Sequence, residues 1–308
     1  MNKNPRTHVV TALACCLLLA ALPAASVADA SLRILIPAYG NPCCGTGFTM
    51  WEQLIDDVLV MGDDLQIILN PNSGPGGPLI DPNYIGPSGE GPLVDLRDNG
   101  GFVIAYVRTD FARLTLADVQ TDIDHYYTPS YWRGAGIQID GIFFDEVSND
   151  LANVGYYETL RDYVRGYDPS ARVVGNPGTA FVNNPSGQTT FTISDYADMA
   201  DTLVTFEVDA DLYVNGYTPP SWLDTRPAES FGNIVYDLPS ASQMVSAMSL
   251  AIRRKARYVY ITDDVLINPY DALPSYWAEQ LEAARGLVFA DGFESGGTDL
   301  WMPAEGGR

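Results

Sequence analysis

Residues 141–150 read GIFFDEVSND, and this stretch joins a short apolar run directly to two adjacent acids. Residues 141–144 have the character of a buried strand, and Asp145 and Glu146 follow it at once. Burying a carboxylate costs several kcal/mol unless the group is paired or used. Acids at the end of a buried strand therefore indicate a functional site at the edge of a sheet.

Seven other segments share this apolar character, and helix-like segments separate them. The expected strands cover residues 32–39, 65–72, 101–110, 139–146, 171–178, 202–209, 233–239 and 256–264, and the clearest helices are expected at 50–61, 116–126, 154–165 and 241–254. Near-continuous apolar runs suit strands that are covered on both faces, as in a parallel sheet. About eight strand and helix alternations predict an α/β fold, a single-domain (β/α)8 barrel of the TIM type. A doubly wound open sheet is the alternative, which periodicity alone does not separate from the barrel.

Polar residues end nearly every expected strand, and this pattern favours the barrel. Barrel enzymes gather their chemistry at the carboxyl ends of several strands at once. A single Asp or Asn at such a place is commonly a turn or a helix cap, so the evidence lies in the whole ring. Its members are Tyr39, Asn70, Asn72, Arg108, Asp110, Asp145, Glu146, Asn176, Glu207, Asp209, Asp237, Asp263 and Asp264.

The two ends of the chain are expected to lie outside the barrel domain, which we place at 31–288. Residues 1–30 have cations in front, an apolar stretch and small residues at the end, as in a secretory signal. A lipoprotein anchor is the alternative, but Cys15 and Cys16 lie inside the apolar stretch rather than after it. No later stretch approaches the roughly 18 apolar residues that a membrane span needs. We expect a secreted or periplasmic protein with an acidic, glycine-rich tail at 289–308.

The chain is strongly acidic, with a formal net charge of −22. Such a surface repels nucleic acid and anionic membranes, and it attracts a cationic or an uncharged substrate. We therefore exclude nucleic acid as a partner and expect a monomer.

Histidine and cysteine are scarce beyond the expected signal. His125 would be the one histidine for a zinc site or a Ser-His-Asp triad, so we interpret it as a surface or capping residue and expect neither metal nor cofactor. Cys43 and Cys44 are adjacent, which leaves a vicinal disulfide or two loop thiols open. The Gly- and Pro-rich loop at 70–92 lacks a phosphate-binding signature and is expected to form a wall of the active-site groove.

Two carboxyl groups suffice to hydrolyse a glycosidic bond, without histidine or cofactor. Asp145, Glu146 and Glu207 supply such acids from expected strands four and six, which lie one strand apart. This spacing can bring facing carboxyls to the roughly 5 to 5.5 Å seen in retaining enzymes. Adjacent residues on a strand point to opposite faces, so Asp145 and Glu146 cannot both face the barrel axis unless the strand ends or bulges there. The sequence leaves open which of the two does.

Six segments carry a further signal, LRILIPAYGNP, NPNSGPG, GFVIAYVRTDF, GIFFDEVS, VVGNPGT and TFEVD. Together, and in this order, they resemble the spherulin 4 family of secreted glycoside hydrolases. The resemblance implies a (β/α)8 barrel with endo-α-1,4-N-acetylgalactosaminidase activity on galactosamine-rich exopolysaccharide. It also implies a retaining mechanism with Asp145 as nucleophile, Glu207 as acid/base, and Glu146 as a neighbour that orients the sugar or tunes the pair.

Other strand-end side chains are expected to bind the polysaccharide. Aromatic rings stack on sugar faces and their hydroxyls hydrogen-bond sugars, although core packing is an alternative role for each ring. The expected substrate-binding residues are Tyr39, Asn70, Tyr106, Asn176, Tyr213, Trp222 and Asp237. Two other functions compete with hydrolysis. A non-catalytic carbohydrate-binding barrel would keep the aromatics without the carboxyl geometry, and a polysaccharide deacetylase would need a metal site.

Overall fold

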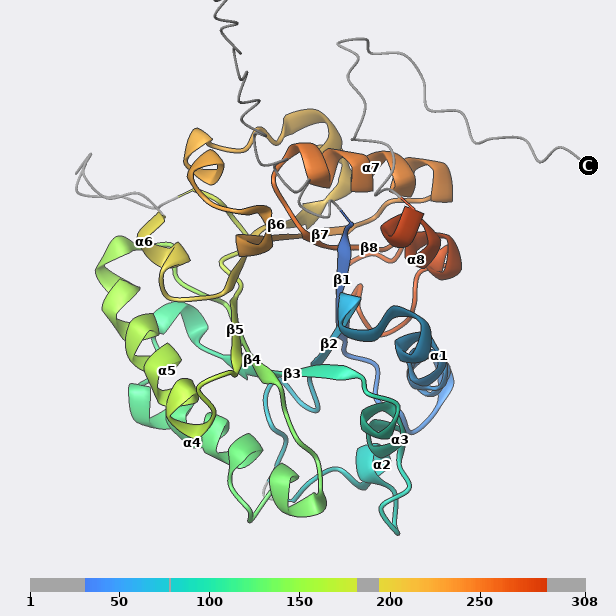
Figure 1. The fold of residues 1–308 in the computed structure, drawn as a ribbon, viewed down its shortest axis with the longest axis vertical. Helices are drawn as coiled ribbons and strands as arrows, with labels where there is room; N and C mark the ends of the chain where they lie inside the picture. The colour runs from blue at the N-terminus through green and yellow to red at the C-terminus, as the bar shows by residue number, and fades with distance from the viewer. Residues whose placement is uncertain (1–30, 78, 182–193, 287–308) are drawn as a thin grey trace, which may run out of the picture.

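The computed structural model describes residues 31–77, 79–181 and 194–286, which fold around one closed barrel (Figure 1). The expected signal at 1–30 and the expected tail at 289–308 lie outside the described residues. Eight parallel strands follow one another around the barrel in sequence order. They are β1 (Arg33–Ala38), β2 (Leu65–Leu69), β3 (Phe102–Arg108), β4 (Gly141–Asp145), β5 (Arg172–Gly175), β6 (Thr202–Asp209), β7 (Phe231–Tyr236) and β8 (Tyr258–Ile261).

The pairing of β1 with β8 closes the sheet, through Arg33 beside Tyr258 and Ile34 beside Val259. This pairing excludes the open sheet and confirms the predicted (β/α)8 barrel. Most strands are shorter than the sequence suggested, because their last residues already belong to the loops that form the rim. All five residues of β2 are buried, as expected for a strand with cover on both faces.

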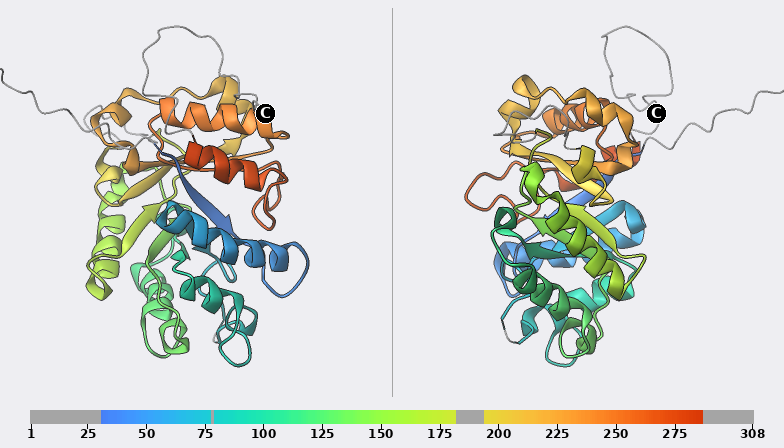
Figure 2. Two further views of the ribbon diagram at one scale, coloured as in Figure 1. Left: turned by 45° about the vertical axis from the view of Figure 1, so that its right-hand side comes forward. Right: turned by 90° about the vertical axis from the view of Figure 1, so that its left-hand side faces the viewer.

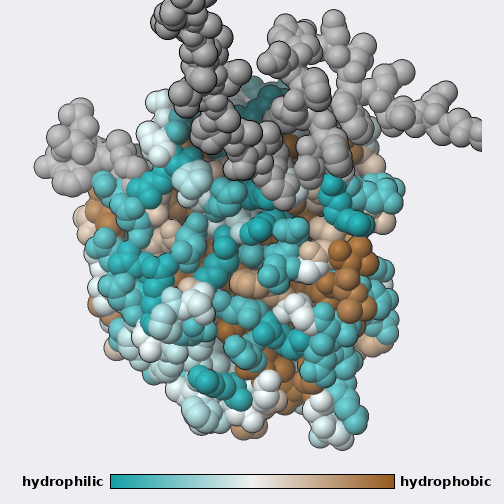
Figure 3. Space-filling view, viewed as in Figure 1, coloured by the Kyte–Doolittle hydropathy of each residue, from teal (hydrophilic) through white to brown (hydrophobic). Residues whose placement is uncertain are grey.

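Helices surround the barrel on its outer side, as Figures 1 and 2 show. Their bounds are α1 (Gly45–Met61), α2 (Pro82–Ile85), α3 (Pro92–Asp98), α4 (Leu116–Tyr127), α5 (Val154–Tyr167), α6 (Ser194–Ala197), α7 (Ala241–Arg253) and α8 (Trp277–Gly286). The four predicted helices correspond to α1, α4, α5 and α7. The face seen in Figure 3 is largely hydrophilic, and an apolar area lies over α1.

The segment at 70–92, expected to be a loop, contains a short helix. The short helix α2 begins at Pro82, and the side chain of Asp81 accepts a hydrogen bond from the backbone N–H of Asn83. Proline at the first helical position and aspartate at the cap both favour a helix start. A helix of four residues shows too little periodicity to be recognised, which explains why this segment looked like a plain loop.

A bulge in β6 determines which of its side chains enter the barrel. The register with β7 shifts between Val204 and Phe206, so Thr205 is an extra residue in the strand. An extra residue exchanges the two faces for everything that follows it. As a result Glu207 points into the barrel, where it meets side chains from the neighbouring strands.

Candidate active site

One amide side chain joins two of the predicted acids at the carboxyl end of the barrel. Asn176 follows β5, between Asp145 at the end of β4 and Glu207 in β6. Its Nδ2 donates to Asp145 Oδ1 at 2.8 Å and to Glu207 Oε2 at 2.5 Å. Because one nitrogen bonds both oxygens, these oxygens are separated by no more than the sum of the two distances, about 5.3 Å.

Tyrosine hydroxyls bond the other oxygen of each acid. Tyr106, in β3, donates to Asp145 Oδ2 at 2.7 Å, and Tyr270, in the loop after β8, donates to Glu207 Oε1 at 2.7 Å. The ring of Tyr39 meets both of these rings edge-on, with centroids 5.7 Å and 5.5 Å away. All four carboxylate oxygens therefore accept a hydrogen bond, and the two side chains are held in fixed orientations.

The surroundings of the two acids differ in charge. Burial raises the pKa of both carboxyl groups, and for Glu207 the negative charge of Asp145 raises it further. Hydrogen bonds from Tyr106 and Asn176 and the positive charge of Arg108 oppose the rise in the pKa of Asp145. Two carboxyls this close favour sharing one proton. The position of Arg108 favours an ionised Asp145 and a protonated Glu207.

Glu146 lies beside this pair but faces other partners. The strand ends at Asp145, and Glu146 takes a left-handed backbone with φ of 50°. Its Oε2 accepts a hydrogen bond of 2.8 Å from Arg108 Nε, and Arg108 also contacts Asp110 at 2.7 Å. Of the two adjacent acids, the structure thus brings Asp145 into the pair and leaves Glu146 in an ion-pair network next to it.

Tyr213 lies in the hydrophobic core, where its ring has no face free for a sugar. The residue is fully buried, its ring packs against Phe206 and Tyr217, and its hydroxyl accepts a hydrogen bond from Asn233. This placement differs from the expected contact with substrate. The apolar surface of a tyrosine ring favours burial when its hydroxyl finds a partner, as here.

Three other expected substrate-binding residues have partners outside the pair. Asn70 accepts a hydrogen bond from the backbone of Gly74 in the loop after β2. Trp222 is half-buried and donates from its indole nitrogen to the carbonyl of Ala180. Asp237 is exposed just after β7, with a left-handed φ of 62°. They lie in loops that follow strands β2, β6 and β7.

Two residues of the site were not selected from the sequence. Tyr270 lies nine residues beyond the end of β8, in a loop, and nothing in its local sequence sets it apart from the chain's 18 tyrosines. Arg108 was visible as a polar strand end, but its contact with Glu146 depends on the register that places Arg108 beside Asp145. A position at the end of a strand is therefore a useful sequence signal for a site residue, whereas the sequence gives no such signal for a site residue in a later loop.

The residues with metal or redox potential also have definite places. Cys43 and Cys44 are free and exposed at the start of α1, as two thiols. His125 is half-buried in the last turn of α4, where its ring centroid lies 4.0 Å from that of Tyr131. Within the described residues, no group of three or more His, Cys, Asp or Glu side chains could hold a metal ion. No helix in this part of the chain is long and apolar enough to span a membrane.

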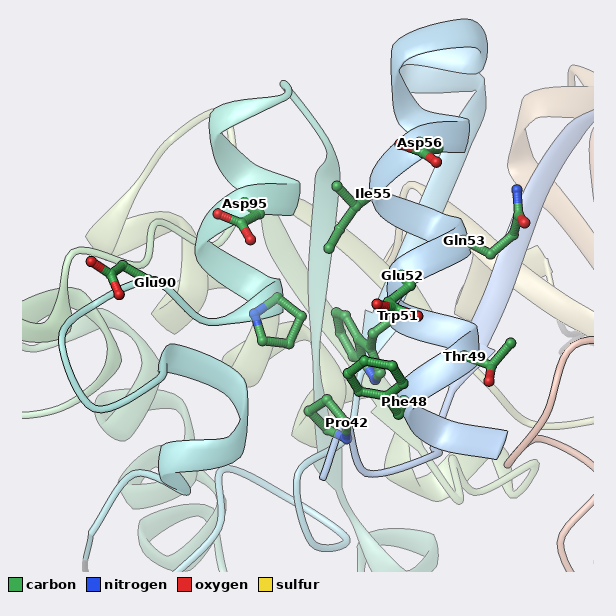
Figure 4. A pocket seen from close by; sticks show the side chains of 11 residues that line it. Pro42, Phe48, Thr49, Trp51, Glu52, Gln53, Ile55, Asp56, Glu90 and Asp95 are labelled. Carbon is green, nitrogen blue, oxygen red and sulfur yellow. The ribbon is translucent and has the colours of Figure 1, made fainter. Parts of the chain in front are cut away.

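A hollow of about 610 Å³ lies apart from the predicted site, between α1 and α3 (Figure 4). Apolar side chains such as Phe48 and Ile55 line it, together with acids such as Glu52 and Asp95. None of the predicted catalytic or substrate-binding residues is part of its lining. The hollow is therefore separate from the carboxyl pair.

Comparison with known proteins agrees with the fold. The model of spherulation-specific family 4 matches residues 33–284. The crystal structure of Aspergillus clavatus Sph3 in complex with GalNAc is similar with a TM-score of 0.64 and 22% identity, over 82% of this chain and 97% of that chain. The endo-1,4-beta-mannanase from Rhizomucor miehei is similar with a TM-score of 0.53 and 10% identity, over 84% of this chain and 95% of that chain. No curated protein sequence matches the chain significantly.

Proposed function

Because this chain belongs to spherulation-specific family 4, we propose that it is a glycoside hydrolase that uses Asp145 and Glu207 as its catalytic carboxyl groups. We propose more specifically an endo-acting, retaining enzyme for α-1,4-linked N-acetylgalactosamine or galactosamine-rich exopolysaccharide. The observation that carries the proposal is the pair itself, two acids from alternate strands bonded by a single amide nitrogen.

The geometry supports a two-step reaction. Glu207 donates its proton to the glycosidic oxygen while Asp145 attacks the anomeric carbon, so the glycosidic bond breaks and a glycosyl–Asp145 ester forms. Glu207, now ionised, takes a proton from a water molecule, whose oxygen attacks the anomeric carbon and releases Asp145. The second attack restores the original configuration and returns both side chains to their starting states.

The separation of the pair favours retention over inversion. Retaining enzymes have carboxyl groups roughly 5 to 5.5 Å apart, and inverting enzymes need roughly 6.5 to 9.5 Å to leave room for a water molecule. The bound of about 5.3 Å on the two bonded oxygens agrees with the shorter range. The charge of Arg108 suits an ionised nucleophile at Asp145, and the neighbouring anion suits a protonated acid at Glu207.

Two further observations support a galactosamine-rich substrate. The resemblance to the spherulin 4 family implies a galactosamine polymer, and the Aspergillus clavatus protein was crystallised with GalNAc. The net charge of −22 suits a polymer that is neutral or carries free amines.

Digestion of a purified galactosamine-rich polysaccharide, followed by mass spectrometry of the products, tests the proposal. The wild-type protein should release oligosaccharides, and Asp145→Asn and Glu207→Gln should each lower the rate by at least about a hundredfold, since an amide neither attacks nor delivers a proton. Glu282→Gln is the matched control, because it makes the same chemical change at an exposed site on α8. Binding of the polymer without release of any product would favour the carbohydrate-binding alternative, and full activity of Glu207→Gln would remove Glu207 from the mechanism.

A further inference from the structure

A second polar hollow lies at the opposite end of the barrel, where the strands begin. Its volume is about 390 Å³. Arg33 and Arg172, the first residues of β1 and β5, line it together with Gln66, the second residue of β2. This end is separated from the catalytic rim by the length of the strands. The hollow therefore plays no part in the proposed hydrolysis.

Arg172 is a largely enclosed cation that forms no ion pair within residues 31–77, 79–181 and 194–286. Its guanidinium lies over the ring of Tyr258 at 4.5 Å, and its Nη2 donates to Thr202 Oγ1 at 2.6 Å. In the described part of the chain no carboxylate lies within ion-pair distance of Arg172, and its Nε has no hydrogen-bond partner. Burial lowers the pKa of this guanidinium by more than Tyr258 and the charge of Asp201 raise it, and the charge of Arg33 lowers it further. Enclosing an arginine without a negative partner is unfavourable, so the arrangement calls for an anion.

A second guanidinium approaches the same ring. Arg33 lies 5.9 Å from the centroid of Tyr258, and its Nη1 donates to the Tyr258 hydroxyl at 3.1 Å. Arg33 has a carboxylate partner, Asp64, at 2.9 Å. Two like charges on one aromatic ring repel each other, and an anion placed between them reverses that repulsion.

Gln66 provides an independent indication of a ligand. Its side chain is only 2% exposed, yet its Oε1 has no hydrogen-bond partner within the described residues. Buried polar atoms in proteins are nearly always bonded, to protein or to a bound water or ion. Rotation of the amide by half a turn directs its NH2 group where Oε1 now lies, so Gln66 has donors available for an anion.

Neither acid that lines the hollow forms an ion pair with Arg172, although the negative charge of Asp201 acts to raise the pKa of its guanidinium. Asp201 Oδ1 contacts Arg165 at 2.8 Å, and Asp201 Oδ2 accepts the backbone N–H of Val173 at 2.8 Å. Asp63 also belongs to the lining, but it is exposed to solvent. Although acids outnumber cations 39 to 17 in the whole chain, three arginines thus meet at one hollow with one of them unpaired.

We propose that this hollow binds a small oxyanion, of the size of phosphate or sulfate, through the Arg172 guanidinium and the Gln66 amide, with Arg33 at its edge. The bound anion joins the beginnings of β1, β2 and β5. Binding therefore stabilises the folded barrel, and the stabilisation grows with the logarithm of the anion concentration once that concentration exceeds Kd. The proposal is independent of the hydrolase assignment, because neither Asp145 nor Glu207 takes part.

Isothermal titration calorimetry of the folded protein with sodium phosphate, at constant ionic strength set by sodium chloride, tests the proposal. We expect one saturable site for phosphate that sulfate occupies in competition. Loss of charge-assisted hydrogen bonds should raise Kd at least about tenfold in Arg172→Gln, and Gln66→Leu should also weaken binding. Arg133→Gln, which removes the same charge from an exposed position, should bind phosphate like the wild-type protein.

Thermal unfolding in the same solutions gives a second readout. Phosphate should raise Tm in the wild-type protein and in Arg133→Gln by more than in Gln66→Leu. General salting effects would raise Tm in all variants alike. Such a uniform response, or the absence of a saturable site in the titration, would overturn the proposal. Arg33→Gln and Gln66→Leu keep the test valid if Arg172→Gln fails to fold.

Discussion

Asn176 fixes the geometry of the two acids because its own amide is fixed. Asn176 Oδ1 accepts the backbone N–H of Gly178 at 3.0 Å, which directs Nδ2 toward Asp145 and Glu207. Assignment of amide oxygen and nitrogen rests on such networks, and here every contact agrees with one orientation. Asn176 thus acts as a positioning residue for the pair.

Replacing Tyr270 with Phe should shift the pH dependence of hydrolysis. The Tyr270 hydroxyl stabilises the ionised form of Glu207 and so opposes the rise in its pKa. Without this bond the pKa of Glu207 becomes higher, and Glu207 stays protonated to higher pH. The alkaline limb of the kcat/KM profile should therefore shift to higher pH. We also expect a roughly tenfold loss in kcat, because the Glu207 carboxyl is held less firmly.

Tyr276→Phe is the control for this measurement, since the Tyr276 hydroxyl donates to the backbone of Leu238 and not to either acid. In Tyr276→Phe the alkaline limb should lie at the same pH as in the wild-type protein. If the alkaline limb of Tyr270→Phe lies at the wild-type pH or shifts to lower pH, the result would contradict the role of Glu207 as the acid.

Part of this site could be predicted from the sequence. Asp145, Glu207 and Asn176 all follow from one rule, that polar residues at the ends of barrel strands face a common rim. The position of Glu146 could not be predicted, because it depends on a left-handed backbone after β4. The partners of Tyr213 and Tyr270 could not be predicted either, because each depends on how a loop packs.

Among the elements, β6 and the turn after β5 align the pair. The bulge in β6 turns Glu207 inward, and the Glu207 amide donates to the carbonyl of Gly178 at 3.1 Å. The sequence predicted the full extent of β6 but not its bulge, since nothing in the run TLVTFEVD marks Thr205 as an extra residue. Helix and strand positions thus followed from periodicity, while the turns that aim the side chains did not.

Gly178→Ala should impair catalysis more than stability. Gly178 has φ of 64°, a conformation that costs an alanine about 1–2 kcal/mol, and a new Cβ would lie 3.7 Å from Glu207 Cβ. Gly136→Ala is the matched control, with φ of 87° and no atom within 4 Å of the added carbon. Denaturant unfolding should show a similar loss of stability in both variants. A lowered kcat should occur in Gly178→Ala alone, and equal activity of the two variants would contradict a positioning role for this turn.

For the whole molecule, the net charge of −22 should affect the encounter with substrate. On a galactosamine polymer with free amines, kcat/KM should fall as sodium chloride increases from about 0.05 M to 0.5 M, because salt screens the attraction. The change should occur mainly in KM. A fully N-acetylated polymer of the same length serves as the neutral control and should show a weaker dependence. Equal salt dependence for the two polymers would mean that the acidic surface does not guide the substrate.

The stereochemistry of hydrolysis shows whether Asp145 attacks the sugar itself. Proton NMR during digestion of the α-linked polymer distinguishes the anomer that is released first. The short separation of Asp145 and Glu207 predicts that the α-anomer appears first and then equilibrates, because two successive displacements restore the starting configuration. Initial release of the β-anomer would contradict the account and would make Asp145 a base that activates water.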